Sequence, residues 1–258
     1  MILDEIVKKR RLRYEEIKKK KPLEKLVGAI QDMPIPRQDF YQLFNRKKFI
    51  YICECKKASP SKGIICKDYR PAEIAKEYEE NGADCISCLT EPDYFLGSNL
   101  DLQAVRQAVK IPILRKDFIV DSYQIYEARL LGAAAVLLIC SILTDTELKE
   151  YIELTHALGL GCLVETHNEE EIHKAIRCNA KVIGVNNRNL KDFTMDTSLS
   201  LRLRAAFPET ILISESGVRE KEDVVRLKQA GLNGVLMGEV LMKSDCPGKK
   251  LKELRDES

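Results

Sequence analysis

The sequence predicts an α/β fold of the (β/α)8, or TIM, barrel class with an N-terminal helical extension. From Phe49 onward, short apolar runs alternate with amphipathic helical patterns, and this alternation repeats eight times. A chain of 258 residues that is 45% hydrophobic is long enough for such a barrel as one domain. No GxGxxG motif follows the first predicted strand, where the phosphate-binding glycines of an open doubly wound sheet would be expected. We therefore expect residues 1–258 to form a single barrel domain.

Residues 1–45 precede the first predicted strand and form the helical extension. The basic cluster from Lys8 to Arg13 is interleaved with acidic residues, so we interpret it as a solvated helix face rather than a phosphate-binding surface. Pro34 and Pro36 break the chain before the first strand. The apolar residues at helical spacing are Ile2, Leu3, Ile6, Val7, Leu12 and Ile17.

Each predicted strand is followed by a helical pattern. Three of these patterns end at a glycine, namely Gly82, Gly159 and Gly231. A glycine at this position is a common signal for the end of a helix. Because strands and helices alternate without a linker, the sheet should be parallel. The predicted strands span residues 49–56, 83–90, 112–118, 134–140, 161–166, 181–186, 210–216 and 234–240.

The net charge and the hydropathy of the chain limit the kinds of partner that it can bind. The 42 basic residues nearly balance the 40 acidic ones, which argues against a nucleic acid or a membrane surface. The N-terminus lacks the apolar stretch of a secretion signal. The longest apolar run, Ala133 to Cys140, is far shorter than the roughly 18 residues that span a bilayer. We expect a cytoplasmic monomer.

The cysteines and histidines do not predict a metal site. Nine cysteines in a chain without an export signal indicate reduced thiols. Cys85 and Cys88 form a CxxC pair, but in a strand residues three apart face opposite sides, so they cannot hold one ion. The histidines that show no metal-binding spacing are His156, His167 and His173.

The first predicted strand ends in two charged residues. Side chains alternate across a strand, so Glu54 and Lys56 share one face with Ile52, whereas Cys53 and Cys55 share the other. Burying an ion pair is costly unless each charge finds partners. From this strand alone, a surface ion pair and a buried functional pair both remain open.

Later strands also end in polar residues, at the edge of a (β/α)8 barrel where chemistry takes place. Alternation puts Lys116 on one face with Leu114 and Phe118, whereas the competing phase would turn Arg115 and Asp117 inward. We expect the alternation in which Lys116 faces inward. We interpret Arg115 and Asp117 as an ion pair at the barrel rim. Lysines and glutamates that converge favour general acid–base chemistry. The other polar residues at strand ends are Glu165, Asn186, Arg188, Glu215 and Ser216.

The last two strands end in Ser216–Gly217 and Gly238–Glu239. In this fold, backbone N–H groups at that place frequently bind phosphate, and glycine lets the backbone come close to it. Together the two glycines predict a phosphorylated small molecule as the substrate.

The order of motifs along the chain is distinctive: it contains CECKKASPSKG, LRKDFIVDSYQIYEAR, LVETHN, GVNNRNL and ISESGV. This combination resembles the indole-3-glycerol phosphate synthase family of tryptophan biosynthesis, and the opening ILDEIVKKR is similar to that family's extra N-terminal helix. The resemblance implies a lyase without metal or cofactor. Its substrate would be 1-(2-carboxyphenylamino)-1-deoxyribulose 5-phosphate, which closes to indole-3-glycerol phosphate with loss of CO2 and water.

The resemblance also implies residue roles. Lys116 matches the catalytic lysine, the general acid for the carbonyl oxygen. Glu165 and Lys56 match the base and acid of the dehydration, and which lysine serves each step stays open. Phe118 matches the apolar wall for the aromatic ring. The residues that match substrate-holding or lysine-tuning positions are Glu54, which we count with the catalytic residues, Asn186, Arg188, Glu215 and Ser216.

The Glu239 side chain and the loop at 57–63 raise two further expectations about the site. Glu239 stands where a small hydroxyl residue can help to hold phosphate, so its carboxylate would have to turn outward while the backbone N–H donates. The loop at 57–63 offers little apolar burial, and we expect a mobile lid that brings Lys56 and Ser59 onto the substrate. A rigid surface turn is the alternative.

Two other functions remain open at this point. A phosphoribosylanthranilate isomerase is a similar barrel with a cysteine base on its first strand, although alternation turns Cys53 and Cys55 away from Glu54 and Lys56. A barrel without catalytic activity, which binds through its basic N-terminal helix, is the second alternative.

Overall fold

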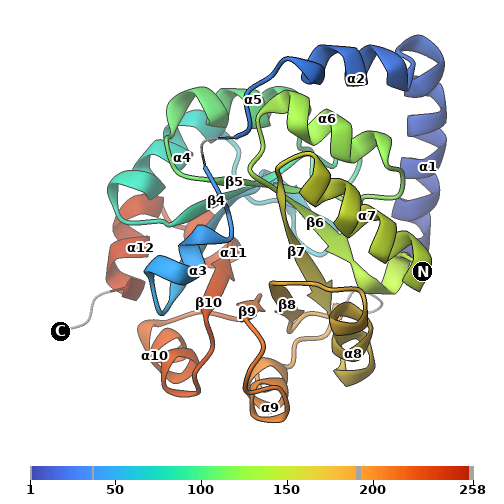
Figure 1. Cartoon of the computed structure of the whole chain (residues 1–258). Helices are drawn as coiled ribbons and strands as arrows, with labels where there is room; N and C mark the ends of the chain where they lie inside the picture. Colours follow the sequence, from blue (N-terminus) through green and yellow to red (C-terminus); the bar gives the residue numbers. More distant parts are fainter. Residues whose placement is uncertain (1, 37, 190–192, 256–258) are drawn as a thin grey trace.

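Eight parallel strands close into a barrel, in the order β1-β10-β9-β8-β7-β6-β5-β4, and helices form a layer around it (Figure 1). This confirms the predicted fold class. The computed structural model describes residues 2–36, 38–189 and 193–255. Met1, Arg37 and Leu190, the last residue of the GVNNRNL motif, lie outside the described residues.

The barrel strands lie within the predicted runs, although most are shorter. The eighth run was predicted to reach residue 240, and this is wrong, because the backbone turns at Gly238 into a short helix. The barrel strands are β1 Ile50–Cys55, β4 Cys85–Leu89, β5 Ile113–Lys116, β6 Ala135–Ile139, β7 Gly161–Thr166, β8 Ile183–Asn186, β9 Leu212–Glu215 and β10 Gly234–Met237. A separate antiparallel hairpin pairs β2 Ala58–Ser59 with β3 Gly63–Ile64.

The helices follow the strands as predicted. Gly82, Gly159 and Gly231 have φ values of +95°, +71° and +82°, so the three closing glycines do adopt the left-handed backbone that ends a helix. The helices are α1 Ile2–Lys20, α2 Leu23–Gln31, α3 Gln42–Arg46, α4 Pro71–Glu80, α5 Asn99–Ala108, α6 Tyr123–Leu131, α7 Asp145–Ala157, α8 Glu169–Arg177, α9 Leu199–Ala206, α10 Lys221–Gln229, α11 Glu239–Met242 and α12 Pro247–Arg255, with a 3-10 turn, η1, at Cys140–Ile142.

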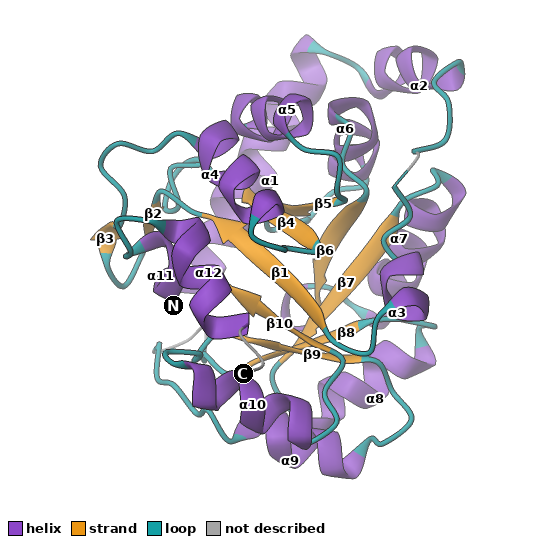
Figure 2. Ribbon diagram, turned by 90° about the vertical axis from the view of Figure 1, so that its left-hand side faces the viewer, coloured by secondary structure: helices purple, strands orange, loops and turns teal. Residues whose placement is uncertain are grey.

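The side chains of the strands form two apolar layers, one inside the barrel and one between the strands and the outer helices. Ile52 and Leu114 pack inside the barrel, whereas Cys53, Cys55 and Cys88 pack between the strands and the outer helices. In Figure 2 the strands cross the middle of the molecule and the helices surround them. Because side chains alternate along every strand, one face of each strand packs in the barrel interior and the other packs against the outer helices.

The N-terminal extension is helical as predicted, but its buried face differs from the prediction. Leu3 and Ile6 are buried, whereas Leu12 is 53% exposed. Arg10, which was assigned to a solvated basic face, is only 2% exposed. In Figure 1, α1 lies along the outside of the barrel beside α6 and α7. The extension is therefore fixed to the barrel partly by a buried charge.

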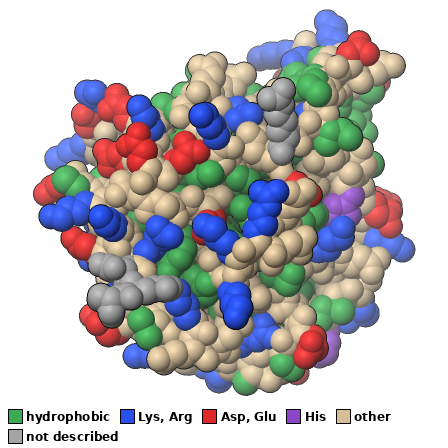
Figure 3. Space-filling model, turned by 60° about the vertical axis from the view of Figure 1, so that its left-hand side comes forward, with side chains coloured by type: hydrophobic (Ala, Val, Ile, Leu, Met, Phe, Trp, Pro, Cys, Tyr) green, Lys and Arg blue, Asp and Glu red, His purple; other side chains and the backbone are tan. Residues whose placement is uncertain are grey.

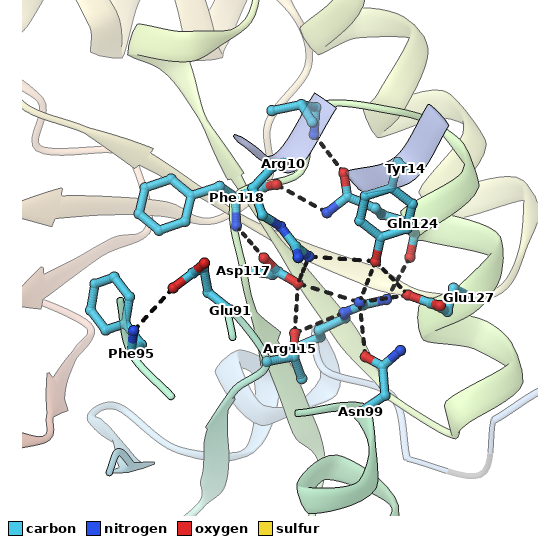
Figure 4. A network of polar contacts seen from close by, with 12 residues as sticks. Arg10, Tyr14, Glu91, Phe95, Asn99, Arg115, Asp117, Phe118, Gln124 and Glu127 are labelled. Atoms are coloured by element: carbon cyan, nitrogen blue, oxygen red, sulfur yellow. Dashed lines mark hydrogen bonds and ion pairs between the residues drawn. The ribbon is translucent and has the colours of Figure 1, made fainter. Parts of the chain in front are cut away.

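That charge belongs to a polar network between α1, β5 and α6 (Figure 4). Arg10 donates to Asp117 Oδ2 at 2.6 Å, and Arg115 donates to Glu127 at 2.7 Å. Tyr14 donates its hydroxyl proton to Glu127 at 2.6 Å. Arg115 and Asp117 do pair, at 3.3 Å, but under α1 on the outer face of β5 rather than across the barrel rim. This network links α1 to β5 and α6.

On the face drawn in Figure 3, basic side chains are spread over the surface with acidic side chains among them. This agrees with the small net charge of +2. No helix among the described residues is long and apolar enough to cross a membrane.

We expect Arg10→Met to lower the free energy of unfolding by about 3 kcal/mol, because it leaves Asp117 buried without its closest cation. Arg13→Met is the matched control: Arg13 lies on the same helix, but its pair with Asp93 is exposed, so the loss should stay below about 1 kcal/mol. Urea unfolding of both variants measures the difference. Equal losses would contradict a stabilising role for the buried pair.

Candidate active site

All the site residues predicted from sequence surround one cavity of about 660 Å³ at the carboxyl ends of the strands. Those on the strands and in the turns after them are Glu54, Lys56, Lys116, Phe118, Glu165, Asn186, Arg188, Glu215, Ser216, Gly217, Gly238 and Glu239. Ser59 reaches the same cavity from the β2–β3 hairpin. The fold therefore gathers these residues from six of its strands and the segments that follow them.

Glu54 and Lys56 point into the cavity from β1. Glu54 is 4% exposed, and its Oε1 lies 2.7 Å from Lys56 Nζ, so the pair is buried and the surface alternative is wrong. Gly238, which directly follows the neighbouring strand β10, leaves room for the pair. A Cβ at that position would lie 2.4 Å from Glu54 Oε1 and 3.1 Å from Lys56 Nζ.

Lys116 ends β5 and lies among carboxyl groups. Its Nζ is 3.3 Å from Glu165 Oε2 and 3.8 Å from Glu215 Oε2. Burial alone would lower the pKa of the Lys116 ammonium, but Glu165, Glu215 and Glu54 together raise it above its ordinary value. Lys116 is therefore protonated at neutral pH and has a proton to donate.

Glu165 is the penultimate residue of β7 and is 1% exposed. Burial would raise its pKa, but Lys116 and His167 outweigh burial and hold the pKa below the ordinary value of a glutamate. Asn186 Nδ2 donates to Glu165 Oε1 at 3.1 Å. Glu165 is thus an ionised carboxylate next to a protonated amine.

Glu215 ends β9 and has the opposite charge state. Burial and the nearby Glu165 raise its pKa to about 8, although Lys116 opposes the shift. Its Oε1 has no hydrogen-bond partner among the described residues. At pH 7 Lys116 therefore lies between an ionised carboxylate, Glu165, and a neutral carboxylic acid, Glu215.

The residues expected to hold phosphate follow β9 and β10. Ser216 and Gly217 have φ values of +65° and +96°, so the backbone turns sharply where a phosphate was predicted. Glu239, whose carboxylate was expected to repel phosphate, lies 3.1 Å from Arg188 and 2.6 Å from Lys243. Two cations thus compensate the Glu239 carboxylate.

Sequence reasoning missed two residues near the site. Phe95 lines the cavity from the loop after β4, and its ring centroid lies 5.9 Å from that of Phe118. Alternation does not extend into loops, so no pattern marked it. The second is His167, which lies 3.3 Å from Glu165 and whose spacing in the sequence indicates no metal site. Its position two residues after Glu165, which alternation places on the same side, was the signal that could have found it.

The cysteine alternative does not fit this geometry. Cys53 and Cys55 are fully buried between the barrel and its helices, and their side chains face away from the cavity. Cys85 and Cys88 lie in different apolar layers, as predicted from their spacing. Among the described residues, no group of three or more His, Cys, Asp and Glu side chains could hold a metal ion. That the reaction needs no metal stays a prediction.

Comparison with known proteins identifies relatives over the whole chain. The family model for indole-3-glycerol phosphate synthase matches residues 3–254. The indole-3-glycerol phosphate synthase of Endomicrobium trichonymphae is 48% identical over 258 residues, which cover 99% of this chain and 100% of the relative. That of Lachnoclostridium phytofermentans is 47% identical over 268 residues, covering 99% of each chain.

Two solved structures share the fold at low sequence identity. A thiamine phosphate pyrophosphorylase from Pyrococcus furiosus superposes with a TM-score of 0.61 at 16% identity, covering 82% of this chain and 96% of its own. KGPDC from Streptococcus mutans has a TM-score of 0.65 at 12% identity, covering 82% of this chain and 97% of its own. These likenesses support the barrel architecture alone.

Fold, cavity and relatives define a (β/α)8-barrel enzyme that acts on a phosphorylated small molecule. Within that class it is a carboxy-lyase of tryptophan biosynthesis. The chain belongs to the indole-3-glycerol phosphate synthase family.

The raised pKa of Glu215 makes stability depend on pH. Between the ordinary glutamate pKa and about 8, the folded protein binds a proton that the unfolded chain does not, so stability falls as pH rises through 8. From pH 7 to 9 we expect the wild type to lose about 1 kcal/mol through this group. Glu215→Gln should show a smaller loss in urea titrations at each pH. Equal losses in both proteins would contradict a neutral Glu215.

Proposed function

We propose that Lys116, Glu165 and Lys56 carry out the acid–base steps by which this cavity closes the indole ring. The observation that carries the proposal is the largely buried Lys116 ammonium between Glu165 and Glu215. It supplies a protonated amine and an ionised carboxylate, side by side in a cavity large enough for the substrate.

The first step forms a carbon–carbon bond. The ring carbon that bears the carboxylate attacks the ribulose carbonyl, and Lys116 protonates the oxygen as negative charge develops on it. The bond to the carboxylate then breaks, CO2 leaves, and its electron pair restores the aromatic ring. Phe118 and Phe95, whose rings lie 5.9 Å apart, form an apolar wall for that ring.

The second step removes water. The hydroxyl formed from the carbonyl leaves with a proton from a lysine, while Glu165 takes the proton from the adjacent carbon. Lys56 reaches the same cavity, so either lysine is within the site to serve this step. Glu54 Oε1 lies 2.7 Å from Lys56 Nζ and so orients that lysine in the cavity.

Substrate binding completes the proposal. The turns at Ser216–Gly217 and at Gly238–Glu239 offer backbone N–H groups to the phosphate, and Arg188 supplies a nearby positive charge. Asn186 accepts a hydrogen bond from the Ser216 hydroxyl at 2.9 Å, which keeps that corner of the site rigid.

We further propose that residues 1–258 act as one domain, as a monomer in the cytoplasm and without a cofactor. The contact between Arg10 and Asp117 supports one folded unit across the extension and the barrel. The nine cysteines are all free thiols, which fits a reducing compartment. Light scattering of the purified protein measures the oligomeric state.

The β2–β3 hairpin is the proposed lid. Ser59, Pro60, Ser61 and Lys62 line the cavity, and its short ladder joins only Ala58 to Ile64 and Ser59 to Gly63. In Figure 2 the hairpin lies at the left edge of the molecule, beyond β1. Ala58 of β2 is buried, but both residues of β3 are exposed, so this small ladder has little burial to hold its outer strand in place.

We expect Lys116→Met to lower kcat at least about 100-fold, because general acid catalysis by a positioned group contributes that much or more. Substrate affinity should stay within about tenfold, since other groups bind the phosphate and the ring. Appearance of the indole chromophore measures kcat. A variant that keeps more than about a tenth of the wild-type kcat would show that Lys116 is not the acid.

We expect trypsin to cleave the free enzyme after Lys57 or Lys62, and a bound product analogue to slow that cleavage several-fold. Lys62 is exposed in the hairpin, so it is the preferred site. Mass spectrometry of the fragments identifies the cut, and Lys62→Gln is the control that assigns it. Equal cleavage rates with and without saturating analogue would rule out closure coupled to the ligand.

A further inference from the structure

His167 carries a largely buried imidazole directly behind the cavity. Its Nε2 lies 3.3 Å from Glu165 Oε1, and its Nδ1 lies 3.2 Å from Glu171 Oε2. The side chain is 15% exposed, and it is not among the described residues that line the cavity. His167 can therefore act on the substrate only through Glu165.

The start of α8 holds the imidazole in place. Asn168 caps the helix by accepting a hydrogen bond from the Glu171 N–H at 2.8 Å. Glu171 Oε2 accepts the His167 backbone N–H at 2.8 Å and also faces the ring at Nδ1. Because one carboxylate oxygen fixes both the backbone and the ring, the direction of Nε2 toward Glu165 is set by the helix cap.

The two oxygens of Glu165 have separate surroundings. Oε1 faces His167 and accepts from Asn186 Nδ2, whereas Oε2 faces Lys116. We propose that His167 is a positioning residue, which, held by Glu171, fixes Glu165 Oε1 so that Oε2 is presented to Lys116 and the substrate. This inference rests on the proposed role of Glu165 as the catalytic base.

The charges around His167 favour an imidazolium. Burial lowers the pKa of the ring, but Glu165 on β7 and Glu171 on α8 raise it to about 10. Lys116 of β5 and Glu215 of β9 reach it only across Glu165, and Glu215 is neutral at pH 7.

The remaining titratable groups nearby do not change that charge state. On the η1 side, the Cys140 thiol has a pKa raised by burial and so stays neutral. Lys174 of α8 donates to the carbonyls of Cys140 and Leu143 and lies 3.4 Å from Asp145, so its charge is directed away from the ring. His167 therefore supplies a positive charge that keeps Glu165 ionised.

His167→Gln tests the proposal, because glutamine keeps a polar N–H group but carries no charge. We expect kcat at pH 7 to fall about tenfold with KM within about threefold, and the acid limb of the kcat profile to move up by about one pH unit. His173→Gln is the matched control. His173 also lies four residues from a glutamate, at 3.9 Å from Glu169, but it is exposed and should leave both quantities unchanged.

Glu165→Gln separates this inference from the proposed function. If that variant keeps a small, measurable residual kcat and His167→Gln causes no further loss in its background, the two residues act as one unit and the proposal is supported. If Glu165→Gln is inactive but His167→Gln behaves like the wild type in kcat and pH profile, the inference fails and the role of Glu165 stands. If Glu165→Gln keeps wild-type kcat, both fail.

A second variant covers the case in which His167→Gln does not fold. Glu171→Gln leaves the imidazole in place but removes its outer carboxylate, and it should move the acid limb in the same direction by a smaller amount. NMR of the His167 ring adds a readout that is independent of turnover. The imidazolium should persist above pH 8 in the wild type, and a neutral ring at pH 7 would overturn the proposal.

Discussion

The Lys116 ammonium can stay in a buried site only because carboxyl groups lie 3.3 and 3.8 Å from it. They belong to Glu165 on β7 and Glu215 on β9, so β5 faces them across the mouth of the barrel. Strand order, closure and alternation must all hold for these charges to meet. The electrostatics of the site thus depend on the whole barrel rather than on a local motif.

A second group of paired charges lies on the outer side of β5. Arg115 and Asp117 alternate with Lys116, and they join Arg10 of α1 and Glu127 of α6 (Figure 4). Asp117 Oδ1 also accepts the backbone N–H of Phe118 at 2.8 Å. The N-terminal helix is therefore connected, through one carboxylate, to the backbone that carries the apolar wall of the cavity.

Much of this could be predicted from the sequence. Period-two alternation placed Glu54, Lys56 and Lys116 inward, and helix-ending glycines marked where units close. Alternation could not show that Arg10 is buried, because a charged residue on a basic helix gives no sign of a distant partner such as Asp117. Nor could it give charge states, since the difference between Glu165 and Glu215 depends on distances and burial in three dimensions.

The alternation of charges along β5 has one more consequence. A shift of one residue in the pairing of this strand would turn Arg115 and Asp117 into the barrel mouth and Lys116 against the helices, exchanging its two faces. Both faces would then hold charges without their partners. A misaligned β5 would be destabilised on both faces, so the charges that serve chemistry and those that attach α1 together favour the native register of this strand.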